Sequence, residues 1–83
     1  METRQLERTD ELLKLAQERV DFPTIWREVR YFDEVDLLVI RFLPSPATYS
    51  KDSIGKGLVY NYDANDNLVS LEILDLYGIY AST

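Results

Sequence analysis

The sequence predicts an α+β domain in which an N-terminal helix packs on a small antiparallel β-meander of about four to five strands. Three observations predict this class. Apolar residues recur at helical spacing near the N-terminus, they alternate with period two after Pro23, and short strand-like segments then follow one another between turn-forming residues. The chain has 83 residues, enough for one domain, and we expect residues 1–22, 24–75 and 76–83 to form its helix, its sheet region and its C-terminal tail.

The segment 3–20 is predicted to form a single helix. Its apolar side chains fall on one face at helical spacing: Leu6, Leu12, Leu13, Ala16 and Val20. Thr3 would cap this long helix, whereas Thr9 would cap a shorter alternative. We favour the longer helix because Leu6 belongs to the apolar face. Pro23 ends the helix, since a proline disfavours helical backbone in the residue before it.

Period-two patterns predict the strands, which are residues 25–32, 37–43, 48–54, 58–62 and 68–74. The second strand is the most apolar, and Pro44 and Pro46 end it because two prolines cannot lie in a central strand. The third is more polar and is expected at a sheet edge. Residues 63–67 are predicted to form a hairpin loop. Residues 77–80 show no clear period and are expected either as a last short strand or as a segment packed across the helix.

Strands that are apolar on both faces predict a sheet that is covered on both faces. Within residues 37–43 one apolar set alternates with another, and a single helix covers only one side of a sheet of this size. The candidate interface residues of the other side are Leu37, Val39, Leu43, Leu68 and Leu74. This side must be covered by a curled sheet, by the tail, by a second copy or by another protein. We expect a homodimer.

The composition predicts no catalytic activity and no metal or other cofactor. The chain contains no Cys and no His, which removes thiol chemistry and the imidazole base or ligand. The segment from Asp63 to Asn67 resembles the start of a calcium-binding loop. However, Leu68 stands where that loop needs Gly, and Leu74 stands where it needs a bidentate Glu. A hairpin turn is therefore favoured there, and strands on both sides of Gly55-Lys56-Gly57 favour a bend over a phosphate loop.

The charge balance is acidic, with a net charge of −6 and a pI near 4.4. An acidic surface repels phosphate backbones, so we expect no direct nucleic-acid partner, whereas a small basic protein is a suitable one. The acidic turn residues are Asp33, Glu34 and Asp36. We interpret them first as a solvated turn and second as an acidic patch for a basic partner.

The hydropathy pattern predicts a cytoplasmic protein that does not enter a membrane. The longest apolar stretch, residues 37–40, is far shorter than the roughly 20 residues that a membrane helix needs. The N-terminal residues mix charges without an apolar run, which is not the pattern of a secretory signal.

The segment from Tyr60 to Leu74, YNYDANDNLVSLEIL, resembles the closing hairpin of the domain of unknown function family 2283. The matching residues there are Tyr62, Asp63, Leu68, Val69, Glu72, Ile73 and Leu74, and upstream Tyr31, Asp36, Leu38 and Ile40 also match. The similarity covers about residues 29–75. Asp66 replaces a glycine of the pattern, and an aspartate can adopt the left-handed conformation that such a turn needs.

The resemblance implies a small β-rich domain without an established activity. Members of the family are often encoded beside small proteins that resemble RelE-type ribonuclease toxins. We therefore expect a non-catalytic acidic protein-binding module, with an antitoxin-like role toward a small basic ribonuclease of that type. The alternative is a self-associating structural protein without a catalytic role.

Overall fold

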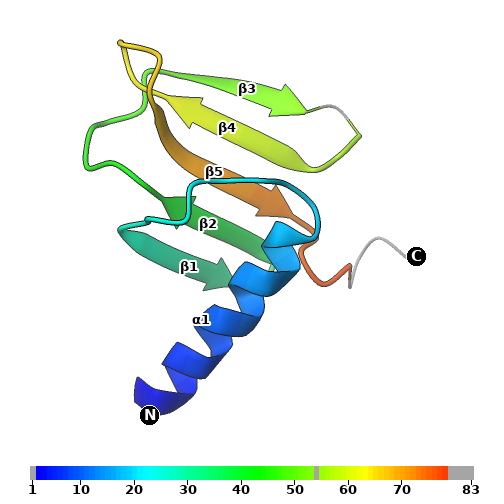
Figure 1. Cartoon of the computed structure of the whole chain (residues 1–83). Coiled ribbons are helices and arrows are strands. Elements are labelled where there is room, and N and C mark those ends of the chain that lie inside the picture. Colours follow the sequence, from blue (N-terminus) through cyan, green and yellow to red (C-terminus); the bar gives the residue numbers. More distant parts are fainter. Residues whose placement is uncertain (1, 54, 79–83) are drawn as a thin grey trace.

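The computed structural model describes residues 2–53 and 55–78, and the side chains of residues 9–53 and 55–78. One helix precedes a five-stranded sheet in this part of the chain (Figure 1). The elements are α1 (Glu2–Gln17), β1 (Glu28–Phe32), β2 (Leu37–Arg41), β3 (Tyr49–Ser53), β4 (Leu58–Tyr62) and β5 (Leu68–Leu74). Every paired set of strands is antiparallel, so the α+β class is confirmed.

The helix α1 ends three residues earlier than its apolar pattern predicts. Val20 lies beyond Gln17, but its backbone N–H still donates to the carbonyl of Ala16 at 3.1 Å. Leu12 and Ala16 are the most buried side chains of the helix, and Leu13 and Val20 are half-buried beside them. The predicted apolar face is thus present in the described side chains, although the side chain of Leu6 lies outside them.

The predicted positions of β4 and β5 agree with the structure, whereas β1 is shorter than predicted. Ile25 and Trp26 precede the strand and are 85 % and 37 % exposed. The ladder starts at the N–H of Arg27, which donates to the carbonyl of Arg41 at 2.7 Å. Because β2 ends at Arg41, residues before Arg27 have no neighbouring strand to pair with.

The strand order is β1-β2-β5-β4-β3, so the meander prediction is wrong. Strands β3, β4 and β5 do form a meander, but the β2–β3 connection crosses to the far edge and gives a Greek-key arrangement. This order places the two most apolar strands, β2 and β5, side by side near the centre of the sheet, where both are paired on each side. The polar strand β3 lies at an edge, as predicted.

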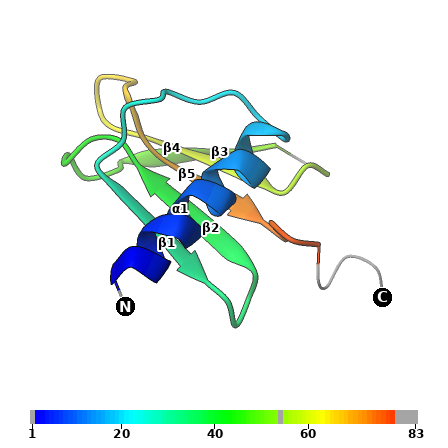
Figure 2. The same cartoon turned by 60° about the horizontal axis from the view of Figure 1, so that its bottom comes forward.

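The two faces of the sheet differ in what covers them. We call the face that bears the buried cluster the inner face; its residues are Val29, Tyr31, Leu38, Ile40, Leu58, Tyr60, Leu71 and Ile73. Leu12 and Ala16 of α1 and Phe22 of the following segment belong to, or pack against, the same cluster. Both views show α1 and residues 18–27 on this side of the sheet (Figures 1 and 2).

We call the opposite side the outer face; its residues are Glu28, Arg30, Phe32, Leu37, Val39, Arg41, Ser50, Asp52, Val59, Asn61, Ser70, Glu72 and Leu74. Strands β1 and β3 are the two edges of the sheet and do not pair with each other in the described residues. The sheet is therefore open, and a curled sheet does not cover the outer face.

Candidate functional site

Three rows of side chains cross the outer face, because paired residues in an antiparallel ladder lie side by side. The first row is apolar and consists of Phe32, Leu37 and Leu74. The second row consists of Arg30, Val39, Glu72, Val59 and Asp52. The third row is polar and consists of Glu28, Arg41, Ser70, Asn61 and Ser50.

The first row and Val39 form a patch that we call the apolar patch, made of Phe32, Leu37, Val39 and Leu74. Phe32 is 41 % exposed and Leu74 is 40 % exposed, which is high for large apolar side chains within strands. Leu37 and Val39 are half-buried. None of the four belongs to the core cluster or packs against it in the described residues. Adjacent exposed apolar side chains on a sheet indicate an interaction surface.

The polar rows of the outer face are largely paired within the chain. The Arg30 side chain donates to the carboxylate of Glu28 at 2.8 Å. The amide of Asn61 donates to the Ser70 hydroxyl at 2.9 Å and to the Glu72 carboxylate at 2.8 Å. These bonds satisfy the buried Asn61 and Ser70, so the polar row beside the apolar patch is hydrogen-bonded within the chain.

Two of the five candidate interface residues lie elsewhere. Leu37, Val39 and Leu74 share the outer face, whereas Leu43 and Leu68 are half-buried against the core cluster. Leu43 follows the end of β2, where strand alternation no longer applies. Leu68 lies beside a register shift at Asn61/Tyr62, and such a shift changes the face on which the following residues lie. The sequence prediction missed Phe32 as the third member of the first row.

The acidic turn does not form the predicted three-residue patch. Asp33 and Glu34 are exposed, but Asp36 is fully buried. The hydroxyl of Tyr31 donates to the Asp36 carboxylate at 2.6 Å, and the backbone N–H of Tyr77 donates to it at 3.0 Å. Asp36 is therefore a structural residue that joins the β1–β2 turn to the segment after β5, and the exposed acid of this turn is limited to two side chains.

The loop 63–67 is a hairpin turn, as the sequence favours. One carboxylate oxygen of Asp63 accepts the backbone N–H groups of Asn65 and Asn67, each at 2.9 Å. The hydrogen bond from the Asn67 backbone is the main reason that the pKa of Asp63 lies below its usual value. Asp66 has a φ of 66°, the left-handed conformation expected of it. No group of three or more acidic side chains that could hold a metal ion is present in the described residues.

The hydroxyl of Tyr49 at the β3 edge donates to the carboxylate of Asp66. This hydrogen bond raises the pKa of Tyr49 from 10.0 to about 12. The Tyr49 ring stacks on Tyr62 with centroids 5.2 Å apart, and the Lys51 amine lies 5.6 Å from the Tyr62 centroid. This cluster therefore joins the β3 edge strand to the neighbouring hairpin.

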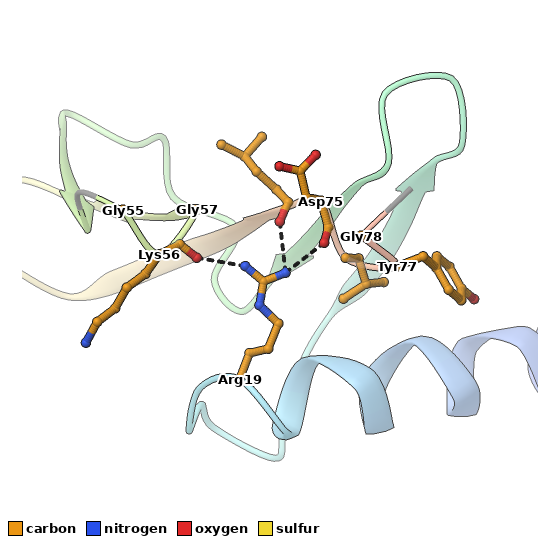
Figure 3. A pocket seen from close by; sticks show the side chains of 9 residues that line it. Arg19, Gly55, Lys56, Gly57, Asp75, Tyr77 and Gly78 are labelled. Atoms are coloured by element: carbon orange, nitrogen blue, oxygen red, sulfur yellow. Dashed lines mark hydrogen bonds between the residues drawn. The ribbon is translucent and has the colours of Figure 1, made fainter. Parts of the chain in front are cut away.

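A hollow of about 400 Å³ lies at the end of the sheet where β5 finishes, and Arg19 spans it (Figure 3). Its guanidinium donates to the backbone carbonyls of Leu74 at 2.9 Å, Asp75 at 3.0 Å and Lys56 at 2.7 Å. Gly57 has a φ of 68°, and a Cβ atom there would lie 3.2 Å from the guanidinium and from the Leu74 carbonyl. These three hydrogen bonds use most of the donors of Arg19 and hold the segment after α1 to the sheet.

Within the described residues, the fold and this surface define a small α+β domain with an open sheet, one face of which bears exposed apolar side chains. The family of proteins of unknown function, DUF2283, matches residues 28–76. This match spans more than half of the chain, so the protein belongs to the DUF2283 family, and α1 lies before the matched segment. Searches of curated proteins and of solved structures gave no match. No helix in the described part of the chain is long and apolar enough to cross a membrane.

Proposed function

We propose that the protein is a non-catalytic protein-binding domain and that the outer face is its binding surface. The observation that carries this proposal is the exposure of Phe32 and Leu74 on either side of Leu37 in one row. Burial of such side chains contributes about 1.5–3 kcal/mol each before the cost of association, so this patch favours contact with another apolar surface.

The roles of the polar groups support a binding function over a catalytic one. Asp36 and Asp63 hold turns, and Arg19 holds three backbone carbonyls. An active site needs polar groups that converge on a substrate in a pocket. Asp36 and Asp63, which the sequence singled out, instead bind neighbouring parts of the same chain.

We further infer that α1 is docked stably on the inner face and is not itself the binding element. Leu12 is 4 % exposed and Ala16 is fully buried in the core cluster. Two polar contacts flank these buried residues in the sequence: Arg19, just after α1, binds the end of β5, and the Tyr77 hydroxyl donates to Glu11 at 2.6 Å. A helix held in this way does not offer its apolar face to a partner, and we therefore take the outer face as the binding surface.

Photo-cross-linking tests the proposal because it traps whichever protein contacts a chosen position. A benzophenone amino acid is placed at position 74 on the outer face and, as the control, at the exposed position 14 on α1, in cells that also express the adjoining genes. We expect protein adducts from position 74 and not from position 14. An absence of protein adducts from position 74 contradicts the proposed function.

A second candidate function is an antitoxin-like role toward a small basic protein such as a RelE-type ribonuclease. The net charge of −6 favours it, because opposite charge accelerates association. Exposed acid at Asp33 and Glu34, in the turn between β1 and β2, suits such a partner. Co-expression with an adjoining basic gene product, followed by purification at low and high salt, tests this role: a salt-sensitive complex supports it, and separate elution at low salt contradicts it.

A further inference from the structure

We infer that the occupant of the outer face is a second copy of this chain. The two copies are related by a two-fold axis that lies between their outer faces and runs parallel to β2. This inference rests on the proposed function, since it takes the outer face as the binding surface. A symmetric pair requires a self-complementary surface, on which each group meets a suitable group after rotation about the axis. The residues of the first two rows on β1, β2 and β5 meet this requirement.

The first row is symmetric about β2. Phe32 on β1 and Leu74 on β5 lie on opposite sides of Leu37 at the same level of the ladder. Rotation about an axis along β2 exchanges the two flanking strands and keeps the levels unchanged. Phe32 then faces Leu74 of the second copy, Leu37 faces its own counterpart, and the apolar row is covered along its whole length.

The second row adds a charge match. Arg30 on β1 and Glu72 on β5 lie on opposite sides of Val39. The same rotation places Arg30 opposite Glu72 of the second copy, twice in each pair of chains, and places Val39 opposite its counterpart. Arg41 is the one like-charge position of this arrangement. Its guanidinium donates to the Ser45 carbonyl at 3.2 Å and is thereby directed toward the β2–β3 connection.

A two-fold axis across the strands does not give a comparable fit. Such an axis reverses the order of the three rows. The first row of one copy then lies opposite the third row of the other, and Leu37 lies opposite Arg41 of the second copy. The apolar first row then faces the polar row Glu28, Arg41 and Ser70 instead of another apolar row, so its side chains gain less from burial. The row order therefore selects the axis along β2, with the two sheets roughly 10 Å apart as in other face-to-face sheet packings.

The charge of the outer face favours a second copy over a strongly basic partner. This face carries two basic side chains, Arg30 and Arg41, and three acidic ones, Glu28, Asp52 and Glu72, which gives −1 against −6 for the whole chain. The excess acid thus lies outside the outer face. A nearly neutral surface with an apolar centre avoids the repulsion that two acidic chains would otherwise experience.

Charge exchange tests the arrangement. Arg30→Glu and Glu72→Arg each place like charges opposite one another twice, and we expect each variant to self-associate at least ~10-fold more weakly than the unmodified chain. An equimolar mixture of the two restores opposite charges at both positions, and it should recover dimers with one copy of each variant in native mass spectrometry. A mixture that stays monomeric, while both variants keep the wild-type circular dichroism spectrum, overturns the inference.

A cross-linking measurement covers the case in which Glu72→Arg does not fold. The chain contains no cysteine, so single cysteines are unambiguous probes. Val39→Cys lies at the axis and should cross-link to its counterpart with a short bismaleimide. Asp52→Cys on β3 is the control. It lies about 29 Å from its counterpart, six strand spacings away across the pair, and should not form this cross-link. The reverse pattern, or no cross-link from position 39, overturns the inference; the proposed function still stands if photo-cross-links from position 74 identify a different protein.

Discussion

Asp36 stabilises the fold more than any other acidic side chain of the β1–β2 turn. It is fully buried, has a φ of 53° and accepts hydrogen bonds from Tyr31 and from the backbone of Tyr77. We expect Asp36→Ala to lower the free energy of unfolding by about 2–4 kcal/mol, because it leaves two donors without their acceptor. The control Asp33→Ala, at an exposed position, should change it by less than about 0.5 kcal/mol. Urea unfolding measures both, and equal midpoints contradict the structural role of Asp36.

Asp63 makes the stability depend on pH. Hydrogen bonds from the backbone of Asn67 and Asn65 lower the pKa of its carboxyl below 3.8 in the folded chain. A lowered pKa adds stability above the unfolded value, and this stability is lost as the pH falls through the folded value. The unfolding midpoint of the wild type should therefore exceed that of Asp63→Asn at pH 7 and approach it below about pH 3. If the difference between the two unfolding midpoints does not change with pH, the stabilising role of the Asp63 carboxylate is contradicted.

Residue-scale features were predictable where they depend on neighbours in the sequence. The left-handed Asp66 and the hairpin role of Asp63 follow from local turn chemistry. The burial of Asp36 depends on Tyr77, 41 residues away, and the contacts of Arg19 depend on carbonyls more than 30 residues away. Such contacts are set by tertiary packing, so the sequence pattern around Asp36 indicated only an acidic turn.

At the scale of elements, the inferred docking of α1 rests on Leu12 and Ala16 of the core cluster. Leu12→Ala removes a side chain that is 4 % exposed and should lower the free energy of unfolding by about 2–5 kcal/mol. The control Gln17→Ala is exposed on the same helix and should have little effect. Thermal unfolding followed by circular dichroism compares the two variants. If both variants have the melting temperature of the wild type, α1 does not unfold cooperatively with the sheet.

Strand positions were easier to predict than strand order. The bounds of β4 and β5 follow from residue alternation and from the turn residues between them. The pairing of β2 with β5 is set by tertiary packing, which buries the two most apolar strands together. The alternation of residues within one strand does not reveal which strand it pairs with. The same limit applies to Leu43 and Leu68, whose faces changed at a strand end and at a register shift.

At the scale of the whole molecule, the proposed binding surface rests on the unequal distribution of apolar and charged groups. The inner face is filled by its own chain, whereas the outer face keeps Phe32 and Leu74 about two-fifths exposed. Because two strands are apolar on both faces, the sequence predicted a second apolar side that needs a cover other than the helix. It could not predict which residues align across strands, since Phe32, Leu37 and Leu74 come together only through the observed strand order.

The mass of the unmodified chain in solution tests the central claim most directly. Light scattering at about 10 μM should give twice 9.7 kDa for the wild type, because the apolar patch is buried between two copies. Val39→Lys should reduce the mass to 9.7 kDa by placing an unpaired charge at the axis, and Lys51→Ser on the opposite face should leave it unchanged. A mass of 9.7 kDa for the wild type contradicts the claim that the outer face binds a second copy.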